Sequence, residues 1–233
     1  MRVYFDHLVN ETGQIRTFFF RPETRISYTA GQYIELNLKH DHPDSRGTKR
    51  WFTLSSSPNS QLITITTRII DESSSFKKAL LKLKKGDELN INGPFGDFVL
   101  PKLIQTPLVF VAGGIGITPF HSILAWLEEA KEVRPIKFLY AVRTEDDIIF
   151  LEVFNKPWLH STVVVTEPSP AWGGERGKLS AEMIVGLTNP NEDTLIYLSG
   201  PEPMVEDLGK DLLKSGIKKQ QLVQDFFPNY PDY

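Results

Sequence analysis

The chain has 233 residues, no cysteine, 40% hydrophobic and 24% charged residues, a composition typical of a soluble globular protein with a sizeable core. The lack of cysteine excludes disulfides, cysteine-ligated zinc, iron–sulfur clusters and a thiol nucleophile. The net charge of -3 gives no reason to expect binding to nucleic acid or to an anionic membrane surface.

The chain shows no signal for export or for membrane insertion. Its first residues lack the apolar core of a signal sequence, and the longest apolar run, residues 108–117, is short and rich in glycine. Such a run does not cross a bilayer. We therefore expect a cytoplasmic protein.

The chain up to Pro101 reads as β-strands. Short segments rich in aromatic and β-branched residues are separated by polar turns, and several alternate as half-buried strands do. The expected strands cover residues 3–9, 15–20, 33–38, 50–54, 62–69, 88–92 and 98–100. One helix is expected over 74–84, with Ser73 or Ser74 as its N-cap. This spacing favours a small antiparallel β-barrel.

After Pro101 the pattern changes to alternating strands and helices. Residues 108–112 form an uninterrupted apolar run, which is typical of a strand buried on both faces. Further strands are expected over 136–142, 162–166 and 194–199, and helices over 119–131, 148–154, 180–185 and 203–215. This alternation predicts an α/β fold with a doubly wound parallel sheet. We therefore predict two domains, residues 1–101 and residues 102–233.

Segment 112–119, AGGIGITP, lies between the buried strand and the next helix. Its glycines allow a sharp turn and the close approach of a diphosphate to backbone N–H groups. Thr118 is a candidate N-cap, and Pro119 suits the first turn of the helix. The segment differs from the standard Gly-x-Gly-x-x-Gly pattern. A tight turn without a ligand is the alternative.

Segment 50–53, RWFT, places an arginine beside aromatic residues and a hydroxyl. On a strand, Arg50 and Phe52 share one face and Trp51 and Thr53 the other. Such residues suit a flat, phosphorylated ligand, which they bind by charge-assisted hydrogen bonds and by stacking. The alternative is a core Phe52 with Arg50 at a solvated edge.

Five motifs, in this order, resemble those of the ferredoxin–NADP⁺ reductase superfamily. Segment 31–33, GQY, is similar to its Gly-Gln strand motif, and segment 50–53 to its flavin motif Arg-x-Tyr-Ser/Thr. Segment 93–96, GPFG, resembles the Gly-Pro-x-Gly that closes its flavin domain. Segment 113–119 resembles its nicotinamide diphosphate loop, and segment 199–204, SGPEPM, its late Cys-Gly-Pro-x-x-Met. The resemblance extends over about residues 3–226.

This resemblance implies that the β-barrel domain binds a flavin. Arg50 would bind a flavin phosphate, Phe52 would stack on the isoalloxazine, and Thr53 would hydrogen-bond near the reactive N5 as a catalytic residue. The remaining flavin contacts that it implies are Trp51, Thr66, Thr67, Arg68, Ser74, Ser75, Phe76 and Gly93. Diphosphate contacts at residues 74–76 favour FAD over FMN. Phe52 lacks the hydroxyl of the usual tyrosine.

The resemblance further implies that the second domain binds a pyridine nucleotide. The residues that would hold it are Gly113, Gly114, Gly116, Thr118, Gly200 and Pro201. Arg143 and Arg176 lie where several members bind the 2′-phosphate, which favours NADPH and leaves NADH possible.

Two further positions depart from the family pattern or extend it. Ser199 stands where the family usually has a cysteine near the nicotinamide C4, and it is the second catalytic candidate. Near the C-terminus, the resemblance implies that an aromatic side chain covers the other face of the flavin. The candidates are Phe226, Phe227 and Tyr230.

The function implied is that of a flavin-dependent NAD(P)H oxidoreductase, which transfers a hydride from NAD(P)H to FAD N5 and electrons to a separate carrier such as ferredoxin or flavodoxin. Lysines within residues 77–85 offer a basic face to an acidic carrier, although a solvated helix face is the alternative. Two other functions stay open: a flavin reductase that uses free flavin, and a non-catalytic flavin- or nucleotide-binding subunit. No metal site is expected, because His40 and His42 have no third ligand at a diagnostic spacing.

Overall fold

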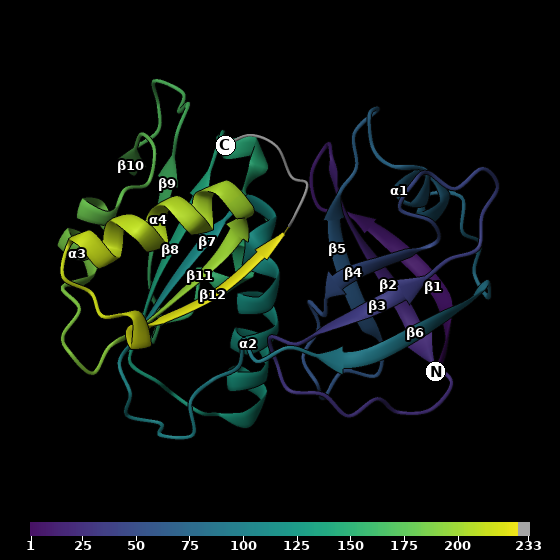
Figure 1. Ribbon diagram of the computed structural model, residues 1–233, viewed down its shortest axis with the longest axis horizontal. Coiled ribbons are helices and arrows are strands. Elements are labelled where there is room, and N and C mark those ends of the chain that lie inside the picture. Colours follow the sequence, from purple (N-terminus) through teal and green to yellow (C-terminus); the bar gives the residue numbers. More distant parts are fainter. Residues whose placement is uncertain (228–233) are drawn as a thin grey trace.

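The computed structural model describes residues 1–227, which form two six-stranded β-sheets with helix α2 (Ile117–Ala130) between them (Figure 1). Strand pairs of the N-terminal sheet are antiparallel, and strand pairs of the C-terminal sheet are parallel. The predicted fold class is therefore confirmed.

The N-terminal sheet is curled and has the strand order β4-β3-β6-β1-β2-β5. Its strands are β1 (Arg2–Asn10), β2 (Ile15–Pro22), β3 (Tyr33–Asn37), β4 (Lys49–Thr53), β5 (Ile63–Arg68) and β6 (Glu88–Phe95). The edge strands approach each other where the Ser55 N–H, just after β4, donates to the Thr64 carbonyl of β5 at 2.9 Å. The curl encloses one apolar core, which is why side chains alternate between buried and exposed along β3.

Helix α1 (Ser75–Leu80) closes one end of this core with the buried side chains of Phe76 and Leu80. Ser74 is its N-cap, as predicted, because the Ser74 Oγ accepts from the Lys77 N–H at 3.3 Å. The helix ends before the expected residue 84. The amides of Lys82 and Leu83 bond to the third residue back, which turns the chain more tightly than an α-helix.

The C-terminal sheet has the strand order β10-β9-β8-β7-β11-β12. Its strands are β7 (Leu108–Gly113), β8 (Ile136–Val142), β9 (His160–Val165), β10 (Glu175–Arg176), β11 (Leu195–Pro201) and β12 (Leu222–Phe227). Connections between them contain α2, α3 (Ala181–Thr188), α4 (Glu202–Lys214) and the 3₁₀ turns η1 (Gly114–Gly116), η2 (Glu145–Asp147), η3 (Leu151–Val153) and η4 (Lys219–Gln221).

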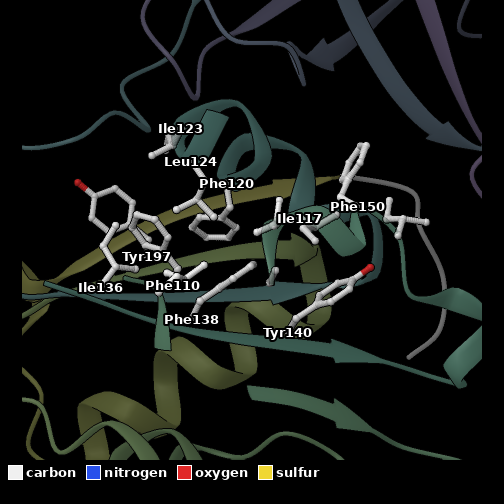
Figure 2. Packing of buried hydrophobic residues seen from close by; sticks show 14 of the residues in the cluster. Phe110, Ile117, Phe120, Ile123, Leu124, Ile136, Phe138, Tyr140, Phe150 and Tyr197 are labelled. Carbon is white, nitrogen blue, oxygen red and sulfur yellow. The ribbon is translucent and has the colours of Figure 1, made fainter. Parts of the chain in front are cut away.

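Apolar side chains cover both faces of this sheet. On one face Phe110 of β7 and Phe138 of β8 pack against Phe120 of α2, with a Phe110–Phe120 ring-centroid distance of 4.7 Å (Figure 2). On the other face Val109 and Val111 pack against α3 and α4. Burial on both faces explains the uninterrupted apolar run of β7.

Several expected elements differ in the structure. Residues 98–100 form no strand, because Phe98 is buried against Tyr197 of β11 with ring centroids 5.1 Å apart. Segment 148–154 is not one helix, since Phe150 adopts a left-handed φ of +56° and interrupts it. The edge strands β10 and β12 were not predicted.

The boundary after Pro101 falls between β6 and β7 and stays a prediction. Phe98 belongs to the core of the second sheet, although it precedes that boundary. Within residues 1–227, no helix has the length and apolar composition that a membrane span requires.

Candidate active site

A cleft of about 1570 Å³ opens between the two sheets, beside the carboxyl ends of β7 and β8. It brings together predicted site residues from both sheets: Arg50, Trp51, Phe52, Thr53, Thr66, Arg68, Ser74, Gly114, Thr118 and Arg143. The other predicted residues lie off its walls: Thr67, Ser75, Phe76, Gly93, Gly113, Gly116, Arg176, Ser199, Gly200 and Pro201. The side chains of Phe226 and Phe227, and the whole of Tyr230, lie outside the described residues.

The cleft adjoins the point where the parallel sheet changes winding direction. Strand β7 is flanked by β8 on one side and by β11 on the other. In open α/β sheets, ligands bind at the carboxyl ends of the strands at such a switch point. The loop after β7 and the end of β11 therefore occupy the expected position of a nucleotide site.

The loop after β7 owes its glycines to two different requirements. A Cβ on Gly116 would lie 2.2 Å from the Ser199 carbonyl oxygen of β11, so no side chain fits there. Gly114 has a left-handed φ of +49° and lines the cleft. Close approach of a ligand to the backbone is thus open at Gly114, whereas Gly116 serves the packing of the loop on β11.

Thr118 is not the N-cap of α2, which corrects the sequence prediction. The helix follows η1 directly, and its N-cap is Gly116. The Thr118 hydroxyl donates to the Ile115 carbonyl at 3.1 Å inside the first turn. The 3₁₀ turn starts the helical backbone earlier than the proline suggested.

Strand β4 turns its aromatic residues in opposite directions. Phe52 is 8% exposed and packs in the barrel core, with its ring centroid 6.0 Å from that of Phe76. Trp51 is 65% exposed, and its ring lies 5.9 Å from Tyr33 on the cleft side. The broad exposed aromatic face in the cleft therefore belongs to Trp51.

Two arginines of the cleft are held by carboxylates. Arg50 donates to both carboxylate oxygens of Asp44, at 2.8 and 3.0 Å. Arg68 of β5 donates to Asp147 of η2 at 2.7 Å. Among the described residues, the buried Nε atoms of both arginines have no hydrogen-bond partner. Each guanidinium therefore retains donor capacity for a further anion.

Asp44 carries its charge in a mixed environment. Partial burial raises its pKa, but the Arg46 amide and the Arg50 guanidinium outweigh this effect and hold the pKa of Asp44 below its ordinary value. The ionised carboxylate fixes the Arg50 side chain against the cleft wall.

The residues at the start of α1 act largely within the N-terminal domain. Ser74 lines the cleft while its hydroxyl caps the helix. The Ser75 hydroxyl accepts from the Asp44 N–H at 2.9 Å and lies 3.0 Å from His40 Nε2. Of residues 74–76, Ser74 lines the cleft, and the expected ligand contacts of this segment stay a prediction.

Ser199 is fully buried at the end of β11, paired with Ala112 of β7. Its hydroxyl is one of the buried side-chain groups that lack a hydrogen-bond partner among the described residues. An unpaired buried hydroxyl costs free energy, about 1–3 kcal/mol in typical proteins. Ser199 does not line the cleft, so it is the unpaired hydroxyl at the switch point that keeps it a candidate ligand contact.

Arg143 and Arg176 do not form one cationic site. Arg143 follows β8 and lines the cleft, with its Nη1 3.8 Å from the Glu167 carboxylate. The Arg176 guanidinium donates to the carbonyls of Trp172 and Pro170. Both arginines were expected at one phosphate, and the sequence alone did not show that they have different partners.

Helix α2 is bonded to the segment that follows β4. His121 Nδ1 donates to the Ser55 carbonyl at 2.6 Å, and the Ser122 hydroxyl donates to the Ser56 carbonyl. The Tyr28 hydroxyl also donates to Ser56, at 2.9 Å, and burial raises the pKa of Tyr28 to about 12. These contacts fix Thr53 relative to the second sheet.

The structure adds cleft residues that the motifs did not indicate. They include Asp147, Gln224 and Asp225. Tyr33 also lines the cleft, and it belongs to segment 31–33, for which the sequence analysis had given no ligand contact. Asp147 is the partner of Arg68 from another domain, and no local pattern signals such a pairing.

Gly93 lies beside the cleft, in a hollow of about 510 Å³ that Tyr33, Trp51 and Phe95 also line. Its φ of +120° is open only to glycine in ordinary structures. Gly93 therefore shapes the outer rim of the site.

Comparisons with known proteins agree with this architecture. Residues 110–210 match the family model described as "Oxidoreductase NAD-binding domain". "NADH oxidoreductase HCR" from Escherichia coli K12 is 26% identical over 219 residues, which are 94% of this chain and 66% of that protein. The chain thus spans just under two thirds of this relative's length.

Solved structures share the fold over nearly the whole chain. The FAD/NAD-binding domain of nitric oxide dioxygenase from Vibrio cholerae has a TM-score of 0.82 at 21% identity, covering 97% of this chain and 98% of that one. A ferredoxin–NADP⁺ reductase from Neisseria gonorrhoeae has a TM-score of 0.79 at 19% identity, covering 97% and 98%. These similarities agree with the resemblance found in the motifs: residues 110–210 match an oxidoreductase NAD-binding domain, and the chain has the two-domain fold of the ferredoxin–NADP⁺ reductase structures.

Proposed function

We propose that the chain is a reductase in which the N-terminal domain holds FAD and the C-terminal domain delivers a pyridine nucleotide to it. One observation carries this proposal: a single cleft joins the wall of Trp51 and Thr53 to Gly114 at the switch point of the parallel sheet. Solved structures with the same fold include proteins whose names include FAD, NAD or NADP.

The residues of the first domain fit a flavin. Trp51 offers an exposed aromatic face for the ring system. Among the described residues, the Nε–H groups of Arg50 and Arg68 have no hydrogen-bond partner, so both can donate to a diphosphate. Thr53 is nearly buried at the end of β4 and lines the cleft, which suits a hydroxyl that fixes the reactive edge of the ring. On this geometry Trp51, rather than Phe52, stacks on the ring system.

The residues of the second domain fit the nucleotide. Gly114 lets a diphosphate approach the start of α2, where backbone N–H groups and the helix dipole favour an anion. Ser199 would place its unpaired hydroxyl beside the nicotinamide. A bound flavin supplies an acceptor for the nucleotide's hydride and a store from which electrons leave singly. The protein orients the two rings and excludes water.

The electron acceptor that we propose is a separate carrier protein, such as ferredoxin or flavodoxin, or a small molecule. The lysines near α1 support an acidic carrier, since Lys77 and Lys78 line the cleft and Lys82 and Lys84 follow on the same segment. Trp51 and Phe95 add exposed aromatic surface in the hollow that both of them line.

The test is reconstitution of the purified protein with FAD, followed by desalting and anaerobic addition of NADH or NADPH. We expect retained yellow colour and bleaching of the flavin absorbance. Loss of all colour on desalting, with rapid reduction of added flavin, identifies a reductase of free flavin. Retained FAD without bleaching by either nucleotide contradicts the proposed reaction and favours a binding subunit.

A further inference from the structure

The turns after β8 and β9 carry charged side chains, among them Arg143 and Glu167. NADH and NADPH differ at one place, where NADH has a ribose 2′-hydroxyl and NADPH has a dianionic 2′-phosphate. In dinucleotide-binding sheets the 2′ position lies near the end of the second strand, where a carboxylate accepts from the hydroxyl or an arginine binds the phosphate. Here the second strand is β8, and Arg143 follows it directly.

Arg143 does not stand alone at this position. The Glu167 N–H donates to the Arg143 carbonyl at 2.8 Å, which fixes the two turns side by side. The Glu167 carboxylate lies 3.8 Å from Arg143 Nη1. A phosphate bound to Arg143 would therefore lie next to a carboxylate of the same sign.

The surrounding charges add to this effect. Residues 143–147 and 166–178 together carry three basic and five acidic side chains. Arg176, the second cation expected at the phosphate, is directed to backbone carbonyls rather than to Arg143. The Glu145 carboxylate accepts from the Ser169 N–H at 2.9 Å, and this hydrogen bond lowers the pKa of Glu145, so its charge persists.

We propose that Glu167 makes the chain selective for NADH, by accepting a hydrogen bond from the ribose 2′-hydroxyl and repelling a 2′-phosphate. This inference rests on the proposed function and departs from the NADPH preference expected from Arg143 and Arg176. Arg143 is then a partner that orients Glu167, rather than a phosphate ligand.

The test uses the flavin-loaded protein and two oxidised nucleotides, NAD⁺ and NADP⁺, with binding measured by titration calorimetry. We expect the wild type to bind NAD⁺ more tightly. Glu167→Gln removes the charge at almost unchanged size, so it should shift the NADP⁺-to-NAD⁺ affinity ratio roughly tenfold towards NADP⁺, and Glu167→Arg should shift it further. Glu192→Gln changes an exposed carboxylate outside these two turns, which pairs with Lys218; it is the matched control and should leave the ratio unchanged.

Stopped-flow reduction by NADH and NADPH gives a second readout. An equal or tighter binding of NADP⁺ by the wild type, or an unchanged ratio in Glu167→Gln, overturns the assignment of Glu167 while the reductase proposal stands. If neither nucleotide binds or reduces the flavin, the proposed function itself is wrong, and the assignment of Glu167 falls with it.

Discussion

The guanidinium of Arg68, on β5, donates to the carboxylate of Asp147, after β8, at 2.7 Å, so that one ion pair joins the two sheets across the cleft. Asp147 is held in place by Thr144, whose N–H and hydroxyl both donate to its second carboxylate oxygen, at 3.2 and 3.0 Å. The pair is therefore preorganised from the side of the second domain.

We expect Asp147→Asn and Arg68→Lys each to destabilise the protein, and the double variant to lose less than the sum. Because Arg68 is about one third exposed, the coupling should amount to only about 1 kcal/mol. Urea unfolding of the four proteins measures it. Lys214→Gln, which removes an exposed pair with Asp211, should show no comparable loss. Strict additivity of Asp147→Asn and Arg68→Lys would show that the contact contributes nothing.

The opposite orientations of Trp51 and Phe52 separate ligand binding from folding. Phe52→Ala opens a cavity in the barrel core and should lower the free energy of unfolding by roughly 3 kcal/mol. Trp51→Ala removes an exposed ring, so it should change stability by less than about 0.5 kcal/mol. Urea unfolding of both variants without flavin gives this comparison.

With FAD added, Trp51→Ala should bind it more weakly and leave its fluorescence less quenched than in the wild type, because the stacking partner is gone. Phe52→Leu, which keeps an apolar core side chain, serves as the comparison. Unchanged affinity and fluorescence in Trp51→Ala would transfer the stacking role to another residue.

Gly116 has no room for a side chain. The added Cβ of Gly116→Ala would lie 2.2 Å from the Ser199 carbonyl oxygen, so the loop after β7 must move away from β11. We expect a loss of at least about 2 kcal/mol, measured by urea unfolding. Gly186→Ala is the control: it lies in α3 with nothing within 4 Å of the new Cβ, and it should stabilise the protein by about 0.5–1 kcal/mol.

Ser199 offers a test of whether its hydroxyl is kept for function. Removing an unpaired buried hydroxyl is favourable, so Ser199→Ala should raise the free energy of unfolding by about 1 kcal/mol or leave it unchanged. At the same time it should slow reduction of bound FAD by the nucleotide, followed by stopped flow. Ser199→Cys should leave FAD binding intact and change only that rate. Loss of bound FAD in Ser199→Cys would place the residue elsewhere in the site.

Glu152 should make the stability of the protein depend on pH, because it is hydrogen-bonded to His121, which also contacts Ser55 of the N-terminal domain. The hydrogen bond from His121 lowers the pKa of Glu152 below its ordinary 4.5. Because the pKa of Glu152 is lower in the folded state, its ionised carboxylate stabilises the protein at a pH above 4.5. This stabilisation is lost as the pH falls through 4.5 and below. We expect the Tm difference between the wild type and Glu152→Gln to shrink over that acidic range. A difference that grows on acidification would reverse the sign and contradict the assignment.

Local patterns predicted most of the strands and the class of the fold, because these depend on burial along one segment. The apolar run of β7 and the alternation in β3 follow directly from which faces are covered. The opposite faces of Trp51 and Phe52 also follow from the period of a strand, although which face meets the core depends on the partner strand β3.

The misses involve contacts between segments far apart in the chain. Phe98 was expected in a strand, but its ring packs against the second domain. Glu167 and Asp147 acquire their roles only because folding brings them to Arg143 and Arg68. Phe150 has a left-handed backbone conformation that divides an expected helix. Phenylalanine rarely adopts this conformation, so the residue type gave no indication of it.

Helix α2 connects the two walls of the cleft. Its first turn borders the cleft, and His121 and Ser122, one turn further on, hold the segment that continues β4. Thr118 of the same helix lines the cleft, as does Thr53, which lies two residues before Ser55. One helix therefore supports both walls of the cleft, and the proposed flavin and nucleotide sites share this support.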